Sequence, residues 1–374
     1  MQLARLMHER NKYRVHVACM NRSGVLLDEA ERIGVGEIPE YRLSSFYDRN
    51  MVTQMRRFAD FLRAREIDIV QTHDFYTNVF GIAAAWWARV PARIAARRET
   101  VGFRSATQAR VERGAYRLAH AVVANAEAVK KLLIKEGVPA AKIVTVYNGL
   151  DLGRVTLRPG LRREEVLGAL GLAPAAKRKL VTIVANLRHP VKDHPTFLRA
   201  AQRVRAAVPD SAFVIAGEGE LTSEMRSLAS RLGIESDIFF VGRCESIAEL
   251  LFVSDVCVLS SKAEGFSNSI LEYMAAARPV VATDVGGARE AIIEDETGYL
   301  VQTEDDETMA ARIISLLLDP AKRRVMGERA RRIVEDKFSC EAQLNLTENL
   351  YEQLLAQPSA STTRKAKNVG REVT

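Results

Sequence analysis

Residues 255–285 read DVCVLSSKAEGFSNSILEYMAAARPVVATDV, and this stretch decides the fold class. An apolar run at 256–259 is followed by a glycine-containing loop, by a helical stretch that runs toward residue 277, and by a second apolar run at 280–282. Near-continuous apolar strands that alternate with helices indicate a parallel sheet buried on both faces. The stretch therefore predicts an α/β architecture of Rossmann type.

The same alternation extends in both directions from this stretch. The runs predicted as strands form two sets: residues 13–20, 67–72, 93–97, 121–124 and 142–147 in the first half, and residues 180–185, 212–216, 238–241, 256–259, 280–282 and 299–301 in the second. Two parallel sheets in series are expected. The turn-forming sequence Asn-Gly-Leu-Asp at 148–151 ends the first set and marks the boundary between the two.

The length of 374 residues corresponds to about two and a half domains of roughly 150 residues each. We expect an N-terminal domain at 1–153, a C-terminal domain at 154–338 and a final helix at 339–357. Residues 358–374 are polar and basic with almost no large apolar side chains, so we expect a disordered tail. The composition of the whole chain, 47% hydrophobic and 27% charged, is that of an ordinary globular protein.

The positive charge is concentrated in the first half. Residues 1–153 carry 24 Lys and Arg against 16 Asp and Glu, whereas residues 154–357 carry 26 against 30. The imbalance is consistent with an anionic partner, either a membrane surface or a phosphate-bearing substrate, and equally with a solvated basic face. The arginines that decorate the two predicted helices of this half are Arg56, Arg57, Arg63, Arg65, Arg110, Arg113 and Arg117.

Several classes of protein are disfavoured. The longest uncharged stretch, residues 75–88, is shorter than the roughly 18 apolar residues of a membrane span, and the N-terminus lacks the pattern of a signal peptide. The four cysteines show no C-x-x-C spacing, which argues against a zinc site or a disulfide framework. No D-x-D, P-loop, G-x-S-x-G or G-x-G-x-x-G motif is present. A cytoplasmic protein without a bound metal is expected.

The strongest functional signal is the loop and helix start at 264–272, EGFSNSILE. Gly265 lets a ligand approach the backbone closely, and free N–H groups at a helix start suit an anion. The residues that carry these N–H groups are Phe266, Ser267 and Asn268. Glu264 and Glu272 flank this point and are candidates for holding a sugar and ribose hydroxyls. The alternatives are a plain N-cap at Ser267 or Asn268 and a surface role for Glu272.

Other candidates follow neighbouring strands, at the edge where open α/β sheets bind ligands. The segment after the strand at 180–185 carries Arg188 and Lys192, for which a solvated basic loop is the alternative. Glycine turns follow the next two strands, at Gly217, Gly219 and Gly242. In the first half, His73 follows the strand at 67–72, and a capping or surface histidine is the alternative there. Its neighbour Asp74 is a candidate helix N-cap.

Taken together, the E-x7-E element at 264–272, the strand at 279–283 and the sequence VGGARE at 285–290 resemble the retaining nucleotide-sugar glycosyltransferases of family 4. The sequence at 148–151 resembles the N-G-x-D of that family, and the resemblance covers about residues 1–357. It implies the GT-B fold, with two Rossmann-like parallel-sheet domains that face a cleft. It also implies that Glu264 contacts the donor sugar and Glu272 the ribose.

The resemblance implies roles for the remaining candidates. The family usually shows G-R-L followed by a lysine, two cations that neutralise the diphosphate, but here Asn186 stands where the arginine is usual. We infer that Arg188 supplies that charge and that Lys192 keeps its own. The glycines at 217, 219 and 242 would line the nucleotide, and His73 would lie near the reacting centre.

The expected function is therefore metal-independent, cofactor-free transfer of a sugar, with retention, from a UDP- or GDP-linked donor to a glycan or lipid-linked acceptor in polysaccharide biosynthesis. A peripheral position at the inner face of the membrane is a further expectation, and no nucleic acid partner is expected. The alternatives are a catalytically impaired GT-B protein that binds nucleotide sugars or serves in assembly, and a nucleotide-sugar 2-epimerase.

The start of the chain departs from the family pattern. The helix at 2–10 resembles the one that follows the first strand and a glycine-rich loop in family members, and neither of these precedes it here. We expect the neighbouring strands at 13–20 and 67–72 to lose a hydrogen-bonded partner. A version extended upstream by such a strand and loop is expected to be more stable and more active.

Overall fold

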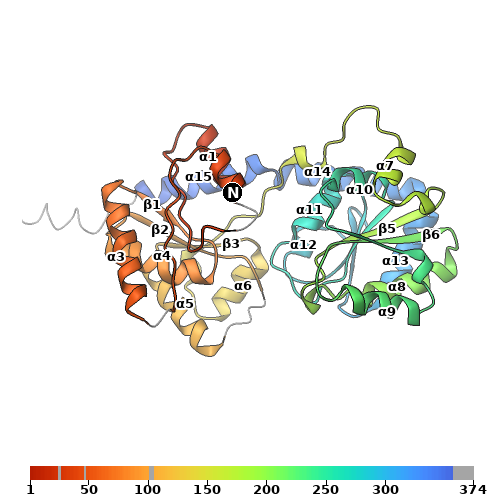
Figure 1. Cartoon of the computed structure of the whole chain (residues 1–374), viewed down its shortest axis with the longest axis horizontal. Coiled ribbons are helices and arrows are strands. Elements are labelled where there is room, and N and C mark those ends of the chain that lie inside the picture. The colour runs from red at the N-terminus through yellow and green to blue at the C-terminus, as the bar shows by residue number, and fades with distance from the viewer. Residues whose placement is uncertain (24–26, 46–47, 101–104, 357–374) are drawn as a thin grey trace, which may run out of the picture. The chain divides into compact units, whose positions relative to one another are not determined.

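A computed structural model describes residues 1–23, 27–45, 48–100 and 105–356 of the chain (Figure 1). By its contacts the chain divides into two compact units. The first comprises the described residues of 1–98, 102–147 and 343–374, and the second comprises those of 99–101 and 148–342. The tail predicted to be disordered, residues 358–374, lies outside the described residues.

The second unit contains a six-stranded sheet in which every pairing is parallel. In chain order its strands are β5 (Lys179–Val184), β6 (Ser211–Ala216), β7 (Ile238–Gly242), β8 (Val256–Leu259), β9 (Val280–Thr283) and β10 (Gly298–Val301). Their spatial order is β10-β9-β8-β5-β6-β7. In register, Val181 of β5 lies between Phe213 of β6 and Val256 of β8. The strand order therefore reverses direction between β5 and β8.

Helices cover both faces of this sheet, which explains why its strands are apolar along their whole length. The helices of the unit are α7 (Arg163–Ala169), α8 (His194–Ala207), α9 (Thr222–Arg231), α10 (Ile247–Val253), α11 (Asn268–Ala275), α12 (Ala288–Ala291), α13 (Asp306–Leu318) and α14 (Pro320–Lys337). One core includes side chains of α8, α9 and α13, and the other includes side chains of α7 and α10. Figure 1 shows these two groups on opposite sides of the strands.

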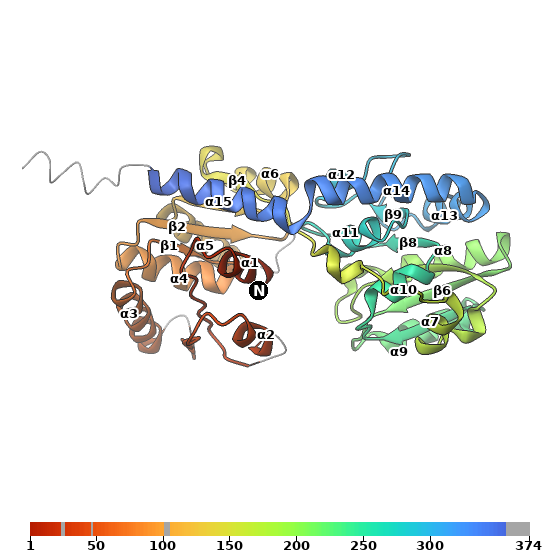
Figure 2. The same cartoon turned by 90° about the horizontal axis from the view of Figure 1, so that it is seen from above.

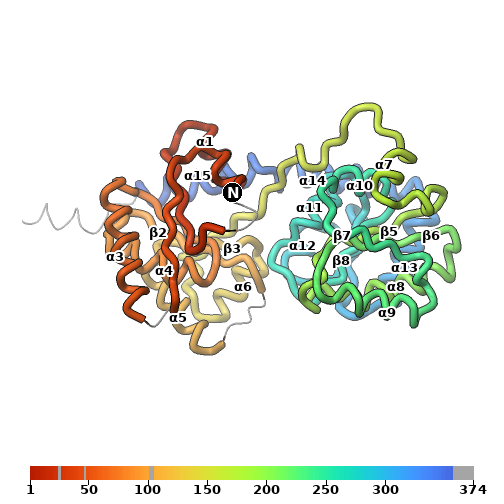
Figure 3. Tube along the Cα trace, viewed as in Figure 1, coloured from red at the N-terminus to blue at the C-terminus, as the bar shows by residue number. Residues whose placement is uncertain are grey.

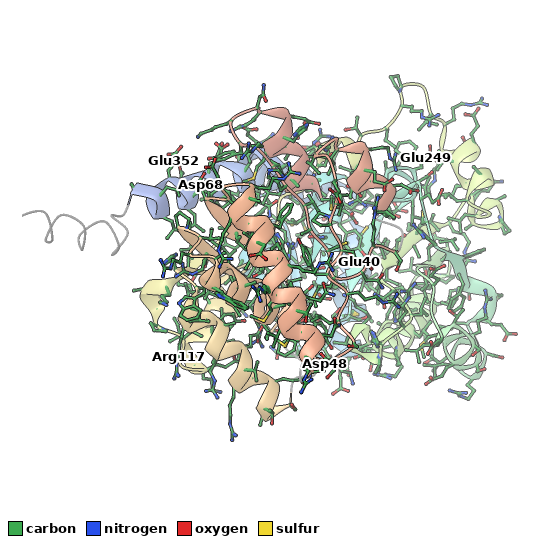
Figure 4. The ribbon with its side chains drawn as sticks, turned by 60° about the vertical axis from the view of Figure 1, so that its left-hand side comes forward. Glu40, Asp48, Asp68, Arg117, Glu249 and Glu352 are labelled. Atoms are coloured by element: carbon green, nitrogen blue, oxygen red, sulfur yellow. The ribbon has the colours of Figure 1, made fainter. Side chains whose placement is uncertain are left out.

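The first unit contains a four-stranded parallel sheet in the order β1-β2-β3-β4. Its strands are β1 (Ile69–Gln71), β2 (Ala92–Arg97), β3 (Ala121–Ala124) and β4 (Ile143–Thr145), and its helices are α1 (Gln2–Glu9), α2 (Leu27–Arg32), α3 (Arg49–Ala64), α4 (Phe75–Trp87), α5 (Ala106–Leu118) and α6 (Glu127–Lys135). Asp48 caps α3 by accepting a hydrogen bond from the Met51 N–H at 2.9 Å, and Figure 4 labels it at that end of the helix.

The last helix, α15 (Cys340–Ala356), packs on the first sheet although it follows the second in sequence (Figure 2). Leu344, Leu350 and Tyr351 share a buried core with Ile94 of β2. The Tyr351 hydroxyl also donates a hydrogen bond to the Gln71 side chain at 2.6 Å. At the surface, Glu352, labelled in Figure 4, pairs with Lys12. The helix therefore completes the core of the first unit.

The predicted strand at 13–20 is wrong, whereas the other ten predicted strands are confirmed within a residue or two. Residues 13–20, near the red end of the trace in Figure 3, form no ladder among the described residues. Their one bridge joins Cys19 to Glu40, where the Cys19 N–H donates to the Pro39 carbonyl at 3.1 Å. An apolar, β-branched run predicts burial, but a strand also needs a backbone partner. Val15 and Val17 still pack against buried cores.

Candidate functional site

The candidate donor site of the second unit lies where its strand order reverses. The loops that follow β5 and β8 leave the sheet at adjacent carboxyl ends because these two strands are hydrogen-bonded neighbours. In open α/β sheets, ligands bind outside the carboxyl ends at this topological switch point. The sequence candidates Lys192 and Glu264 come from these two loops.

The Lys192–Glu264 ion pair is the centre of this site. The Nζ of Lys192 lies 2.6 Å from Oε1 of Glu264, and the two side chains are 21% and 13% exposed. The Ser261 hydroxyl donates to the same carboxylate oxygen at 2.7 Å. Charge-assisted hydrogen bonds of this kind are stronger than neutral ones and hold a carboxylate in one orientation. Glu264 is therefore held in one orientation, and Lys192 balances its charge. Its side chain stays partly exposed.

Main-chain contacts join the two loops that carry this pair. The Lys262 N–H donates to the Val191 carbonyl at 2.8 Å, and the Ser260 hydroxyl donates to the Lys192 carbonyl at 2.9 Å. His194 begins α8 directly behind them and is only 2% exposed. Burial lowers the pKa of His194 to about 4, so its imidazole is neutral at physiological pH. The cationic charge at this point therefore comes from Lys192.

Glycine residues let the neighbouring loops approach one another backbone to backbone. A Cβ on Gly219 would lie 2.1 Å from the Leu187 carbonyl carbon, so only glycine fits where this loop crosses the segment after β5. The N–H of Gly217 donates to the Gly242 carbonyl at 2.8 Å, which joins the loops after β6 and β7. The three glycines predicted to line the nucleotide therefore lie along one continuous edge.

The loop after β9 supports the Glu264–Gly265 segment in the same way. Gly286 has φ +56°, and a Cβ there would lie 2.2 Å from the Glu264 carbonyl oxygen. The Gly287 N–H donates to the Gly265 carbonyl at 2.7 Å. The close contact holds Gly265 in position beside the start of α11.

The start of α11 leaves its first backbone N–H groups without a side-chain cap. Ser267 is the N-cap residue by position, but its hydroxyl makes no capping hydrogen bond. Phe266 is 5% exposed and packs against Phe338 with ring centroids 5.1 Å apart. The packing of Phe266 holds the chain that leads into this helix. A helix start with uncapped N–H groups is suited to an anion.

Asn148, whose role at the site the sequence left unassigned, clamps this helix start. Its side-chain amide donates to the Phe266 carbonyl at 3.0 Å and to the Asn268 side chain at 2.9 Å. Asn148 is 6% exposed, so these hydrogen bonds are shielded from water. The only signal in the sequence is that Asn148 opens the turn motif at 148–151.

Glu272 lies one turn inside α11 and is 7% exposed. Burial raises the pKa of its carboxyl group, and the guanidinium of Arg154, 3.5 Å away, opposes that rise. A surface role for Glu272 is therefore wrong. Arg154 itself is 60% exposed, and nothing in the sequence separates it from other surface arginines. A buried carboxylate with one exposed partner is suited to bind hydroxyl groups of a ligand.

Arg188 is far more exposed than the Lys192–Glu264 pair. Its side chain is 64% exposed, and Nη2 lies 3.3 Å from Oε1 of Glu218. The side chain of Asn186, which stands where the family usually has arginine, accepts a hydrogen bond from the Arg188 N–H at 3.2 Å. Arg188 and Lys192 therefore differ in setting, since Arg188 is an exposed surface cation and Lys192 is held by Glu264.

His73 belongs to the first unit, at the carboxyl end of β1, and its side chain is exposed. The backbone N–H of His73 donates to the Thr77 hydroxyl at 3.2 Å. Asp74 forms a capping box with Thr77 at the start of α4, accepting a hydrogen bond from the Thr77 N–H at 2.8 Å. The prediction that Asp74 is a helix cap is confirmed.

Among the residues that the structure describes, no three His, Cys, Asp or Glu side chains gather in a way that could hold a metal ion. None of the described helices is both long and apolar enough to cross a bilayer.

Two family models match the chain, one in each half. The model described as Glycosyltransferase Family 4 matches residues 1–154, and the model described as Glycosyl transferases group 1 matches residues 172–333. The second match contains the loops of the candidate donor site from the segment after β5 to the loop after β9, whereas Asn148 and Arg154 precede it.

Curated relatives show the same similarity. The N-acetyl-alpha-D-glucosaminyl L-malate synthase of Bacillus anthracis is 32% identical over 217 residues, which are 58% of this chain and 55% of that protein. The UDP-Gal:alpha-D-GlcNAc-diphosphoundecaprenol alpha-1,3-galactosyltransferase of Escherichia coli is 25% identical over 306 residues, 78% of this chain and 76% of that protein. The aligned part thus spans about half the length of the first relative.

Among solved structures, Anabaena Alr3699/HepE in complex with UDP-glucose matches with a TM-score of 0.81 and 21% identity, covering 94% of each chain. This likeness concerns the fold. Together with the two parallel-sheet units, it shows that the chain has the predicted GT-B fold.

Proposed function

The chain belongs to glycosyltransferase family 4, and from that premise we propose that it transfers a sugar, with retention of configuration, from a nucleotide diphosphate sugar to a glycan or lipid-linked acceptor. The observation that carries the proposal is the Lys192–Glu264 ion pair beside the uncapped start of α11. This arrangement offers a held cation, helix N–H groups and a fixed carboxylate at one point of the sheet. Groups of these three types can stabilise a diphosphate leaving group and the positive charge on a sugar.

The proposed chemistry follows from where charge develops. As the bond between the sugar C1 and the diphosphate breaks, negative charge grows on the departing phosphate and positive charge on the sugar ring. Lys192 and the backbone N–H groups near Gly265 would stabilise the first, and Glu264 the second. The acceptor hydroxyl oxygen would attack C1 on the face from which the diphosphate leaves, and the hydroxyl proton would pass to an oxygen of the departing phosphate. Under this proposal His73 lies near the reacting centre and Arg188 supplies a second cation.

Glu272 is proposed to bind the ribose. Its buried carboxylate accepts hydrogen bonds, and a ribose diol offers two adjacent donors. The donor is proposed to be UDP- or GDP-linked, and the solved UDP-glucose complex of a protein with this fold supports the uridine form. Gly217, Gly219 and Gly242 would then face the nucleotide through their backbones.

Metal independence is part of the proposal. In this scheme Lys192, Arg188 and the N–H groups at the start of α11 offset the charge that a divalent cation neutralises in other transferases. Activity should therefore persist in EDTA. Loss of activity in EDTA with recovery on adding manganese would contradict this part of the proposal.

The test of the function is a donor panel read by mass spectrometry. The full chain is incubated with UDP-, GDP- and ADP-sugars and a membrane extract, and products are identified by mass and by anomeric configuration. An acceptor-linked sugar with the donor's configuration supports the proposal. An isomeric free donor would indicate the 2-epimerase alternative, and donor binding without turnover would indicate an impaired nucleotide-sugar-binding protein.

A peripheral position at a membrane is proposed for the first unit. Trp86 and Trp87, at the end of α4, are 55% and 42% exposed, and aromatic side chains of this kind favour the interfacial region of a bilayer. The arginines predicted on α3 and α5 are exposed as well: Arg56, Arg57, Arg63, Arg65, Arg110, Arg113 and Arg117. The relative from Escherichia coli carries a diphosphoundecaprenol acceptor in its name, which supports a lipid-linked acceptor.

Cosedimentation with vesicles tests this position. The wild-type chain should bind vesicles rich in phosphatidylglycerol, and Trp86→Ser with Trp87→Ser should reduce the bound fraction at least threefold. Val325→Ser, an exposed apolar residue of the second unit, serves as the control. Equal binding by all three proteins would contradict the proposal.

A further inference from the structure

A cavity of about 300 Å³ lies in the second unit at the sheet edge opposite the candidate donor site. Its walls include Asp255, which directly precedes β8, and Arg278, which lies just before β9. The loops of the donor site follow the carboxyl ends of the same two strands, so the length of the sheet separates the two places. The volume is at the lower end of that seen for small-molecule sites.

Positive charge exceeds negative charge around this cavity. Asp255 lies 3.1 Å from Arg323 and 4.0 Å from Arg163, and it accepts a further hydrogen bond from the Leu180 N–H at 2.8 Å. Its carboxylate is therefore shared between two guanidinium groups. These groups are partly shielded, since the Arg323 side chain is 19% exposed.

Arg278 adds a third guanidinium to the same wall. It donates to the carbonyl oxygens of Ser254 at 2.9 Å and Ala276 at 3.2 Å, which orient it without neutralising it. Burial lowers the pKa of Arg278, and the nearby carboxylate of Asp255 opposes that shift. Among the residues that line the cavity, Arg278, Arg323 and Arg324 outnumber the carboxylates of Asp255 and Glu328, and the surplus positive charge suits an anion.

The helix that forms the opposite wall carries two basic residues near its start. Arg323 and Arg324 line the cavity from the first and second turns of α14, and the N-cap carboxylate of Asp319 accepts a hydrogen bond from the Lys322 N–H at 2.9 Å. This carboxylate offsets the positive end of the helix dipole, which lets basic residues stand there. Arg324 has a carboxylate partner in Glu328 at 2.9 Å, but both side chains are largely exposed and free to turn toward a ligand.

The cavity wall is held rigid by the packing of α11 on α14. Ala277 has a left-handed conformation, φ +54°, where the chain turns from α11 toward β9. Gly327 packs against it so closely that a Cβ there would lie 2.1 Å from the Ala277 carbonyl oxygen. This contact fixes Arg278, the next residue, relative to the first turn of α14.

We propose that this cavity is a second anion site, separate from the donor site, that binds a small free phosphoanion such as phosphate or pyrophosphate. Arg278 and Arg323 bind the anion from within, and Arg324 closes over it from the rim. Guanidinium groups match phosphate oxygens in geometry as well as charge, because each can donate two parallel hydrogen bonds. Asp255 holds the guanidinium group of Arg323 in place, and the carbonyl oxygens of Ser254 and Ala276 hold that of Arg278.

Calorimetry on the full chain with UDP at saturating concentration tests the proposal, because UDP occupies the donor site. Pyrophosphate and phosphate are titrated separately at constant ionic strength set with sodium chloride. We expect one saturable site for at least one of the two anions. We also expect that anion to raise the Tm above that in equal chloride. No saturable heat from either anion with UDP bound would overturn the proposal.

Two variants and a matched control locate the site. Arg324→Gln should weaken anion binding at least threefold, and Arg323→Gln with Arg324→Gln at least tenfold, while UDP affinity stays unchanged. The control is Arg331→Gln on the same helix, whose pairing with Glu335 matches that of Arg324 with Glu328. Arg323→Gln can lower the Tm because Asp255 loses a partner. In that case, anion binding by Arg324→Gln alone decides whether the site is correctly placed. Full binding in Arg324→Gln, or equal loss in the control, would overturn the assignment.

Discussion

The carboxyl edge and the amino edge of the second sheet are the two ends of the same parallel strands, yet the charged side chains at them are arranged differently. At the carboxyl edge, Lys192 and Glu264 form a pair 2.6 Å apart within loops that glycines bring into contact. At the amino edge, one carboxylate, Asp255, faces several guanidinium groups. A balanced pair can release either partner to a substrate, whereas surplus charge attracts an anion directly. The carboxyl edge is therefore suited to turnover and the amino edge to simple binding.

The largest expected effect comes from removing the cation of the balanced pair. Lys192→Ala should lower kcat by about 100- to 1000-fold, the usual effect of losing one group that stabilises transition-state charge. The control is Lys179→Ala at the amino end of the adjoining strand β5, where the lysine pairs with Asp210 at 3.1 Å. Initial rates should show the control within twofold of wild type. Equal rates for wild type, Lys192→Ala and Lys179→Ala would show that Lys192 takes no part in catalysis.

The next effect concerns the glycine packing of the carboxyl edge. Gly286→Ala should lower the free energy of unfolding by about 2–4 kcal/mol, because the new Cβ meets the Glu264 carbonyl and φ +56° disfavours alanine. Gly168→Ala on α7 adds a Cβ in open space and should raise it by about 0.5–1 kcal/mol. Urea unfolding measures both. The comparison fails if the two substitutions change stability in the same direction.

A smaller effect is expected from the clamp on the start of α11. Asn148→Ala leaves the Phe266 carbonyl without this donor, and a lost hydrogen bond to a shielded group costs about 1–3 kcal/mol. The donor KM should rise as well, since the helix start loosens. Asn345→Ala, an exposed change on α15, should alter stability by less than about 0.5 kcal/mol. An unchanged KM for Asn148→Ala would show that the clamp serves stability alone.

The smallest effect is a pH dependence at Glu272, whose pKa burial raises above the ordinary value of 4.5. Between pH 4.5 and that raised value the folded state binds more protons than the unfolded state, so stability falls as pH rises. Glu272→Gln removes this dependence. The Tm of the variant minus that of wild type should therefore grow from pH 4.5 to pH 7.5.

The same variant should bind UDP about tenfold more weakly, because charge-assisted hydrogen bonds to the ribose are lost. Glu296→Gln, at an exposed position, is the control for both measurements. A Tm difference that shrinks with rising pH would contradict the sign of the shift. Unchanged UDP affinity would contradict the proposal that Glu272 binds the ribose.

The strands were predictable because a buried parallel strand requires an apolar run, and such runs are visible without any contact information. The segment at 13–20 shows the limit of that reasoning. Its side chains do pack into buried cores, as the pattern indicates, but the pattern carries no information on whether a hydrogen-bonding neighbour lies beside it. Burial follows from residue type, whereas strand formation depends on a second segment.

The residues of the candidate site also fall into two groups, those that a local sequence pattern identifies and those that come from distant parts of the chain. Glu264, Gly265 and Glu272 are close in sequence, so a single loop and helix start identifies them, and their catalytic and binding roles stay predictions. Asn148 contacts the same helix start from 118 residues away. Arg154 faces Glu272 from a similar distance along the chain. Neither has a local pattern that separates it from other polar residues near a turn.

By itself the sequence determined the α/β class, ten of the strands, and the loop at 264–272, because these depend on residue type and local spacing. The tertiary structure decided the order β10-β9-β8-β5-β6-β7, and with it the switch point that brings Lys192 against Glu264. It also decided that the guanidinium groups of Arg163, Arg278 and Arg323 meet around Asp255. Electrostatic interactions depend on distances in space, and only the packing of the helices and strands sets those distances.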